Sequence, residues 1–294
     1  MRLLETPAAG FVTRFAPAPT GHLHLGHVAN AIAVWGLARA FDGRVLVRIE
    51  DHDRTRARPE YEASILEDLA WLAFAGDGPV TRQSERGALY EAAFADLEAR
   101  GLVYACACSR REIEALVGVH EGELRYPGTC RAQGLHPSPT PGRRVRIEKG
   151  TVAFRDLCLG DVAQHPAQEC GDVMIRDRNG NWTYQFAVVV DDKAQGVDLV
   201  IRGEDLLSST GRQIQIGRLL GRETPPRFLH HPLILRADGR KLSKSNRDTG
   251  IRDLRAAGWS VERVLGAAAA SLGLTAGEPV DQAEIVARIG RLID

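Results

Sequence analysis

The amino-acid sequence predicts an α/β fold in which helices cover both faces of a parallel sheet. Short strand-like runs alternate with helical patterns in the early part of the chain, and strand and helix patterns follow one another again after about residue 196. Such alternation is typical of parallel sheets, because two parallel strands can be joined only by a crossover connection. The chain has 294 residues, which is long enough to bury a large core.

The first strands and helices follow from local patterns. Residues 11–16 are predicted to form a strand that ends at the turn-forming segment 17–21. Apolar residues at helical spacing then predict a helix that begins near Gly26. Residues 45–49 predict the next strand, and residues 59–74 predict a helix with a proline in its first turn.

Later elements are expected to complete the sheet. The segment 172–192 is predicted to be a hairpin that turns at Asn179-Gly180, because this dipeptide is a strong turn signal. The other predicted elements are a strand at 197–201, a helix at 209–220, a strand at 228–235 and short helices over 251–294.

The pattern changes near residue 104, where cysteine, proline and glycine become frequent, and this change predicts an inserted subdomain. We therefore expect four parts. They are a first half of the main domain at 1–103, an insertion at 104–171, a second half at 172–245 and a C-terminal helical domain at 246–294.

Composition excludes several classes of protein. Basic and acidic residues each number 38, so the formal net charge is zero, which argues against a protein that coats nucleic acid. No apolar run is long enough to cross a bilayer and no signal peptide is evident, so we expect a cytoplasmic protein that does not bind membranes. The five cysteines are too few and too clustered for a secreted disulfide scaffold.

The segment His24-Leu25-Gly26-His27 is the first candidate site. It lies between a predicted strand and a predicted helix, where unpaired N–H groups and the helix dipole attract anions. Gly26 lets a nucleotide approach the backbone, and the two imidazoles can donate hydrogen bonds to phosphate. Histidines that only cap the helix are the alternative interpretation.

The segment Lys241 to Ser245 is the second candidate site. The chain contains only four lysines, at 149, 193, 241 and 244, and two of them fall in this segment. Lysine acts as a point charge toward phosphate, whereas arginine prefers planar, bidentate partners. Together with the early histidines, the two lysines indicate a nucleoside triphosphate site. A solvated surface loop is the alternative, and the scarcity of lysine elsewhere argues against it.

Cys106, Cys108 and Cys130 are candidate metal ligands. Zinc takes four ligands in a tetrahedron and readily accepts sulfur. The sequence supplies three thiolates, and the fourth ligand can be His120, Tyr126 or a water molecule. Ligand chemistry alone favours His120. Three reduced, buried cysteines without a metal are the alternative interpretation.

Taken together, these motifs resemble the signatures of class I aminoacyl-tRNA synthetases. Five segments are similar to the glutamyl member of that class, namely Phe11 to His27, Arg48 to Asp53, Asp68 to Leu72, Val189 to Asp192 and Gly196 to Gly203. The resemblance covers residues 11–247. It implies a Rossmann-type class I synthetase catalytic domain with an inserted zinc-bearing subdomain and a short C-terminal helical domain.

Two features favour one family within this class. About fifty residues follow Ser245, where full-length glutamyl-tRNA synthetases carry a large anticodon-binding region. Val188 lies four residues after Tyr184, where the full-length enzymes commonly have asparagine. The chain therefore resembles the glutamyl-Q tRNA(Asp) synthetase family, whose members activate glutamate without tRNA and transfer it to queuosine in the anticodon of tRNA(Asp).

The resemblance implies roles for individual residues. The residues expected at the α-phosphate and pyrophosphate of ATP are His24, His27, Lys244 and Lys241. The wider ATP site is expected to include Pro17, Gly26, His27, Lys241, Ser243 and Lys244. Glutamate is expected to contact Arg14, Ala16, Ala18, Glu50, Tyr184 and Arg202, with Glu50 on the amine. Taken singly, the two arginines would more commonly form surface salt bridges.

The resemblance also decides the expected metal ligands. The family spaces its ligands as Cys-x-Cys and, after a long gap, Tyr-x3-Cys, which matches this chain. One structural Zn²⁺ is therefore expected on Cys106, Cys108, Tyr126 and Cys130, and Mg²⁺ is expected to accompany ATP. Cys158 and Cys170 belong to no motif.

The expected partners are L-glutamate, ATP and tRNA(Asp) that carries queuosine, and we expect a monomer. Three alternatives remain. They are a glutamyl-tRNA synthetase fragment that charges a tRNA 3′ end, a small-molecule nucleotidyltransferase of the same superfamily, and a non-catalytic tRNA-binding module. The nucleotidyltransferases do not explain the glutamate-site residues together, and the intact histidine and lysine motifs argue against the module. The sequence does not place the residues that contact RNA.

Overall fold

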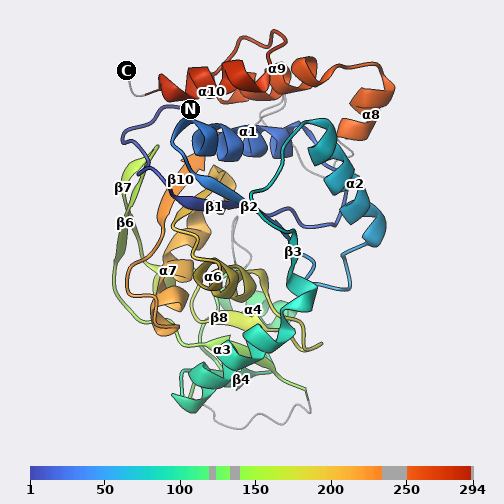
Figure 1. The fold of residues 1–294 in the computed structure, drawn as a ribbon. Helices are drawn as coiled ribbons and strands as arrows, with labels where there is room; N and C mark the ends of the chain where they lie inside the picture. The colour runs from blue at the N-terminus through green and yellow to red at the C-terminus, as the bar shows by residue number, and fades with distance from the viewer. Residues whose placement is uncertain (119–123, 133–139, 234–249, 293–294) are drawn as a thin grey trace.

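The central layer of the molecule consists of two mainly parallel sheets, as the computed structural model shows (Figure 1). The structure describes residues 1–118, 124–132, 140–233 and 250–292. One sheet has the order β1-β2-β3, formed by Val12–Phe15, Arg44–Ile49 and Thr81–Arg82. The other has the order β7-β6-β10-β9, formed by Gly160–Gln164, Val152–Asp156, Arg227–His231 and Leu199–Gly203.

The two sheets meet at β1 and β9. The amide of Asp198 donates to the carbonyl of Val12 at 3.0 Å, and the amide of Val12 donates to the Asp198 carboxylate at 2.8 Å. Across this junction the strand order is β3-β2-β1-β9-β10, which is the order of a doubly wound, nucleotide-binding fold. Ligands of such folds bind at the carboxyl ends of the strands beside the junction.

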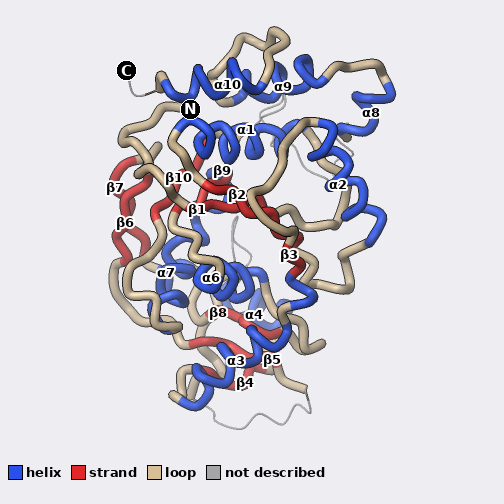
Figure 2. Tube along the Cα trace, in the orientation of Figure 1, coloured by secondary structure: helices blue, strands red, loops and turns tan. Residues whose placement is uncertain are grey.

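Helices cover both faces of this central layer (Figure 2), as the sequence predicts. Helix α1 (Leu25–Ala40) lies on one face, and α6 (Tyr184–Ala194) and α7 (Thr210–Leu219) lie on the other. The helices α9 (Val261–Ser271) and α10 (Gln282–Gly290) pack on the outer side of α1, and α8 (Ile251–Ala256) packs against α2 (Pro59–Trp71).

Helix α1 is therefore covered on two sides, and ten of its sixteen residues are buried. A Cβ atom on Gly36 would lie 2.2 Å from Cδ1 of Ile289, so the glycine lets α10 lie unusually close to α1. A helix that is apolar on most of its circumference belongs in a core rather than at a surface.

A separate antiparallel sheet forms the other end of the molecule. Its order is β4-β5-β8, with β4 at Val103–Cys106, β5 at Gly142–Val145 and β8 at Val173–Arg176. The register between β5 and β8 shifts between Arg143 and Arg144. The helices of this region are α3 (Gly87–Ala99), α4 (Arg110–Val117) and the short α5 (Pro166–Glu169).

Most predicted elements are confirmed, but the predicted hairpin at 172–192 is wrong. The turn at Asn179-Gly180 exists and Arg176 pairs with Trp182, yet the chain then enters α6 instead of a second strand. Seven consecutive residues of α6 are buried, from Phe186 to Asp192. A short, apolar, valine-rich run has no periodicity that separates a buried helix from a buried strand.

Strand pairing crosses the expected domain boundaries. The β6-β7 pair lies within the expected insertion but joins β10 in the main layer, whereas β8 lies beyond the expected insertion and pairs with β5. The division into four parts stays a prediction. Among the described residues, no helix combines the length and apolar character needed to cross a membrane.

Candidate active site and metal centre

His24 and His27 lie at the N-terminal end of α1. The Nδ1 atom of His24 accepts from the amide of Gly26 at 3.1 Å, and Nδ1 of His27 accepts from the amide of His24 at 3.1 Å. Each neutral ring therefore carries its proton on Nε2. The ring centroids are 3.9 Å apart. The histidines do cap the helix, and this capping fixes the tautomer that can donate a hydrogen bond to an anion.

A buried ion-pair cluster connects β1, β2 and α6. The Oδ1 atom of Asp192 accepts from Nε of Arg14 at 3.1 Å and from Nη2 of Arg48 at 2.7 Å. Burial opposes ionisation of Asp192, but the two guanidinium groups outweigh it and lower the pKa of this carboxyl group. One carboxylate oxygen thus holds both arginines in place.

Glu50 follows directly after β2. Its amide donates to the carbonyl of Pro17 at 3.0 Å, and its Oε1 lies 3.9 Å from Nη2 of Arg48. Burial raises the pKa of Glu50, against the positive charge of Arg48. A cationic amine placed beside Glu50 would favour the ionised carboxylate, so this position suits an ammonium group.

Arg202, near the carboxyl end of β9, is held by several side chains. Its Nε donates to Nε2 of His230 at 3.0 Å, its Nη1 to Gln213 at 2.7 Å and its Nη2 to Thr210 at 2.8 Å. Tyr184, the first residue of α6, also hydrogen-bonds with Arg202. The hydrogen bonds to His230, Gln213 and Thr210 use three of the five guanidinium N–H groups. The guanidinium is therefore oriented by the protein and keeps donor capacity for a ligand.

His230 connects Arg202 to Asp156. The Nδ1 atom of His230 lies 2.7 Å from Oδ2 of Asp156, and both side chains are fully buried. Because Nε2 accepts from Arg202, the neutral ring carries its proton on Nδ1 and donates it to Asp156. Burial and the charge of Arg202 lower the pKa of His230, despite its hydrogen bond to Asp156. His230 thus acts on Arg202 as a neutral acceptor.

Four residues of these networks, Arg48, Asp192, His230 and Asp156, are not among the predicted site residues. A signal for two of them exists in the sequence. Arg48 stands among the apolar residues 45–47 and Ile49 of β2, and Asp192 follows the buried valine run of α6. Charged side chains in apolar runs are rarely buried unless they are paired, so such positions indicate a partner elsewhere in the chain.

The remaining predicted residues fall into two groups. Ala16, Pro17 and Ala18 lie in the loop between β1 and α1, where the carbonyl of Pro17 accepts from the amide of Glu50. Lys241, Ser243 and Lys244 lie outside the described residues, as does His120. Directly after the undescribed segment 234–249, Gly250 forms a β-bridge with His24. The chain therefore returns to the histidine motif immediately after the lysine motif.

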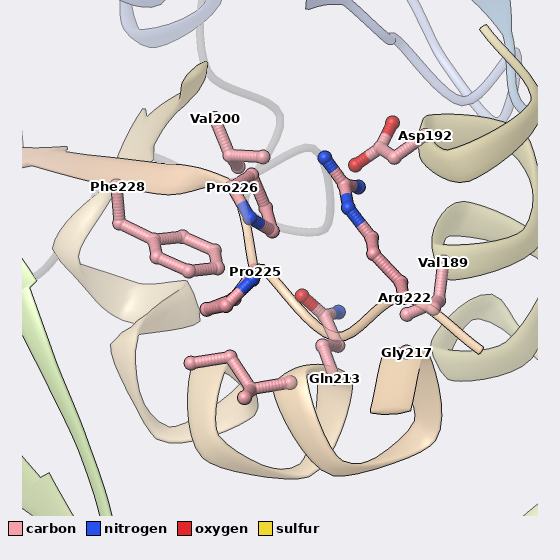
Figure 3. A pocket seen from close by; sticks show the side chains of 10 residues that line it. Val189, Asp192, Val200, Gln213, Gly217, Arg222, Pro225, Pro226 and Phe228 are labelled. Atoms are coloured by element: carbon pink, nitrogen blue, oxygen red, sulfur yellow. The ribbon is translucent and has the colours of Figure 1, made fainter. Parts of the chain in front are cut away.

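A small cavity lies between α6, α7 and the start of β10 (Figure 3). Its lining is mostly apolar and includes Val189, Pro226 and Phe228. Figure 3 shows the guanidinium of Arg222 pointing toward the carboxylate of Asp192. The lining contains neither Glu50 nor the histidines of α1, so this cavity belongs to the packing that supports the ion-pair cluster.

The three predicted cysteine ligands converge at the end of β4. The Sγ atoms of Cys106, Cys108 and Cys130 all lie within 4.8 Å of one another. The Tyr126 hydroxyl lies 3.4 Å from Sγ of Cys106 and 4.0 Å from Sγ of Cys108. Around tetrahedral zinc, two sulfurs lie about 3.8 Å apart and a sulfur and an oxygen about 3.5 Å apart. The cluster could therefore hold a metal ion, and Tyr126 is placed to complete it.

The surroundings fix Tyr126 and disfavour the free thiolate of Cys108. The amide of Tyr126 donates to the carbonyl of Cys170 at 2.9 Å. A Cβ on Gly171 would lie 2.2 Å from the carbonyl oxygen of Tyr126, so this close approach requires glycine. Burial and the neighbouring thiols raise the pKa of Cys108 to about 12. Without a cation, the negative forms of these ligands repel one another.

A family model described as the catalytic domain of class I tRNA synthetases (E and Q) matches residues 11–291. The fold and this match define the chain as a class I tRNA synthetase catalytic domain, and hence as a ligase. A glutamyl-Q tRNA(Asp) synthetase of Burkholderia mallei is 48% identical over 237 residues, which cover 79% of each chain. One of Pseudomonas aeruginosa is 42% identical over 279 residues, which cover 92% of each chain. The chain belongs to the glutamyl-Q tRNA(Asp) synthetase family.

A solved structure supports the fold assignment. The glutamate-tRNA synthetase of Elizabethkingia anophelis superposes with a TM-score of 0.78 at 25% identity. The match covers 94% of this chain and 65% of that one. This chain therefore spans about two thirds of the length of that relative.

Proposed function

We propose that this chain activates L-glutamate with ATP in the absence of tRNA and then transfers the glutamyl group to queuosine in the anticodon of tRNA(Asp). The buried charges at the carboxyl ends of β1, β2 and β9 carry the proposal. Glutamate has one ammonium and two carboxylate groups, and the site offers Glu50 for the first and Arg14 and Arg202 for the others. We assign Arg14 to the side-chain carboxylate.

The activation step needs no covalent protein nucleophile. An oxygen of the glutamate α-carboxylate attacks the α-phosphorus of ATP, the bond to the β-phosphate oxygen breaks, and pyrophosphate leaves. His24 and His27 donate hydrogen bonds on the α-phosphate side, and Lys244, with Lys241 and Ser243, stabilises the leaving pyrophosphate. Mg²⁺ accompanies ATP. Catalysis consists of positioning and charge stabilisation.

The proposed acceptor rests on the relatives, which carry the glutamyl-Q tRNA(Asp) synthetase name at 42 to 49% identity. Transfer to a tRNA 3′ end is the second candidate, and the structural similarity to a glutamate-tRNA synthetase favours it. Both reactions use the same adenylate. Because ATP and tRNA are cytoplasmic, we place the reaction in the cytoplasm.

The cysteine cluster is proposed to hold one structural Zn²⁺ on Cys106, Cys108, Tyr126 and Cys130. The donor distances and the donor chemistry support this assignment. Bound zinc would tie the end of β4 to the segment that carries Tyr126 and Cys130. We propose no role for the metal in the reaction.

Exchange of pyrophosphate into ATP tests the activation step. The wild-type chain is expected to catalyse glutamate-dependent exchange without tRNA. Lys244→Ala is expected to lower the exchange rate at least about tenfold, a loss of ~1.4 kcal/mol in transition-state stabilisation. Lys149→Ala removes a lysine from an exposed position and serves as the matched control. Equal rates for the two variants would remove Lys244 from the mechanism.

Transfer of labelled glutamate tests the acceptor. Label is expected on tRNA(Asp) that contains queuosine and not on the same tRNA without it. The label should survive mild deacylation of the 3′ end. Label that requires an intact 3′ end and ignores queuosine would instead support the second candidate.

A further inference from the structure

We propose that Arg144 is the charge-compensating partner of the zinc site, and that it holds Cys106 and Tyr126 in their ligating positions. The inference rests on the zinc site proposed above. It concerns a residue that belongs to none of the motifs described in the sequence.

The contacts of Arg144 involve two of the four proposed ligands. Its Nε donates to Sγ of Cys106 at 3.2 Å. Its Cζ lies 3.7 Å from the centroid of the Tyr126 ring, so the guanidinium stacks on the face of the phenol. Its Nη1 donates to the carbonyl of Asp172 at 2.7 Å, and this third contact fixes the orientation of the guanidinium. One planar cation thus spans a sulfur ligand and an oxygen ligand.

The pairing of β4 with β5 places Arg144 at the cluster. Arg144 pairs with Tyr104, and Gly142 pairs with Cys106, in an unbroken antiparallel register. Successive side chains of a strand point to opposite faces, so residues two apart share a face. Arg144 therefore lies on the face of the sheet that carries Tyr104 and Cys106. Its neighbour Val145 packs into a different hydrophobic cluster from the one that contains Cys106 and Tyr126.

Asp172, whose carbonyl accepts from Arg144, is itself held by hydrogen bonds. Arg144 pairs with Tyr104 across β4 and β5, and the Tyr104 hydroxyl donates to the Asp172 carboxylate at 2.6 Å. The other carboxylate oxygen of Asp172 accepts from the amide of Ile147 at 2.8 Å. The carbonyl that receives Arg144 is therefore anchored on both sides.

Charge balance supplies the main argument. No ion pair between described residues joins Arg144 to a carboxylate, although its side chain is only slightly exposed. A buried guanidinium without a counter-charge is unfavourable. Three thiolates and a phenolate around Zn²⁺ carry a formal charge of −2 by simple addition of charges. The guanidinium and the ligand set therefore neutralise each other in part, and each explains the burial of the other.

Zinc affinity tests this role directly. Arg144→Met keeps an apolar chain of similar length but removes the charge and the N–H donors. We expect its zinc affinity, measured by competition with a chromophoric chelator, to fall at least about tenfold. Arg144→Lys keeps a cation but cannot both donate to sulfur and stack flat on the ring, and we expect a loss of at least about threefold.

Arg146→Met is the matched control. Arg146 lies two residues further along, and its Cζ lies 5.0 Å from the Tyr104 ring centroid, in a second cation–π contact. It donates to the carbonyls of Gly101 and Arg131 and not to a cysteine. The same chemical change at this position should leave zinc affinity within about twofold of the wild-type value.

The absorption spectrum of the Co²⁺-loaded protein separates an effect of charge from a loss of packing, because a loss of packing alone would not shift the thiolate-to-cobalt band. In the Co²⁺-loaded protein, a nearby positive charge stabilises the sulfur electrons that move to the metal on excitation. Arg144→Met should therefore shift the thiolate-to-cobalt absorption band to longer wavelength, and Arg146→Met should not.

The outcomes separate the two proposals. A wild-type chain that binds no zinc would overturn the zinc site itself. A wild-type chain that binds zinc, together with an Arg144→Met variant of equal affinity and unshifted cobalt spectrum, would overturn the role of Arg144 alone. If Arg144→Met does not fold, Arg144→Gln takes its place, because it also removes the charge, and unchanged affinity and cobalt spectrum in that variant overturn the role equally. Glutamate-dependent pyrophosphate exchange enters neither decision.

Discussion

The two candidate sites treat buried charge in opposite ways. At the carboxyl ends of the parallel strands, Asp192 already pairs with Arg14 and Arg48, so opposite charges within the chain balance one another. In the cysteine cluster, donor groups of the same sign converge, and Arg144 is the neighbouring cation described above. The first site is organised before any ligand binds, whereas the second, under the zinc proposal, is completed by a cation from outside.

This difference has a physical cause. An amino-acid site must bind and release its substrate in each turnover, so its geometry has to persist when it is empty. A structural metal is bound once, and its binding free energy contributes to folding. The contrast predicts that substitutions in the first site damage both stability and substrate binding. Damage in the second should remain largely structural.

The largest expected effect comes from Asp192→Asn. The substitution leaves Arg14 and Arg48 buried without their shared anion, and breaking a buried pair costs about 3–5 kcal/mol. We expect a loss of that order in the free energy of unfolding, measured with denaturant, and at least a tenfold rise in KM for glutamate. The KM for ATP should stay within about twofold.

Asp77→Asn is the matched control for this prediction. Asp77 pairs with Arg39, and the two side chains are 30% and 42% exposed. Exposed pairs contribute only about 0–1 kcal/mol. Equal losses in the free energy of unfolding in the two variants would show that the Asp192 cluster contributes no more to stability than an exposed ion pair.

The Asp192 cluster also predicts a pH dependence. Because the pKa of Asp192 is lowered, the free energy of unfolding of wild type should exceed that of Asp192→Asn above about pH 4, and this difference should vanish as the pH falls further.

Removal of the metal is expected to have the next largest effect. Free zinc at a hundred times its dissociation constant adds ~2.7 kcal/mol to stability. Treatment with a chelator should therefore lower the thermal midpoint of wild type, and Cys106→Ser should abolish that response. Glutamate-dependent exchange at 25 °C should change little.

Cys158→Ser provides the comparison for the metal experiment, because Cys158 is not among the three clustered cysteines. This variant should respond to the chelator as wild type does. A loss of exchange activity that parallels the loss of metal would contradict the separation between the two sites.

A smaller effect is expected from His230→Gln. The glutamine oxygen can still accept from Arg202, but the hydrogen bond to Asp156 is lost. We expect a rise of about threefold in KM for glutamate, or roughly 0.7 kcal/mol, and a larger rise for His230→Ala. Equal KM values for wild type and both variants would refute the positioning role of His230.

The same variant tests a pH dependence. The folded chain keeps His230 neutral with a lowered pKa, so the unfolded chain binds more protons as the pH falls below about 6.5. Wild type should therefore lose free energy of unfolding between pH 7.5 and 5.5. The loss should be smaller in His230→Gln, which has no imidazole at this position. If the free energy of unfolding falls equally with pH in both proteins, the result would count against a neutral His230.

Local sequence patterns predict much of the fold. Strands β1, β2, β9 and β10 and helices α1, α2 and α7 form where alternation, turn residues and helical spacing place them. The predicted hairpin fails at α6, because a buried valine-rich run carries no periodic signal and tertiary packing decides its conformation. The pairing of β8 with β5 and of β6 with β10 depends on contacts that no local pattern records.

The candidate site shows the same division. His24, His27, Glu50 and the cysteine ligands stand in short motifs, so their residue types and spacing can be read directly. The anion that holds Arg14 lies 178 residues further along the chain, and no local pattern connects the two. Arg144 reaches the cysteines only because β5 pairs with β4 in the register that puts it on the same face as Cys106. Chemistry can be predicted from motifs, whereas the groups that orient it follow from the folded topology.

The burial of α1 has a consequence for how far the chain can be shortened. The helix that presents the two imidazoles has the sheet on one side and α9 and α10 on the other, with Gly36 and Ile289 in close proximity. Deleting the last helices would expose an apolar surface on α1 to water and remove the packing that holds this helix in place. The smallest unit able to fold around these imidazoles therefore extends at least to α10, so the C-terminal helices are a structural part of the catalytic domain.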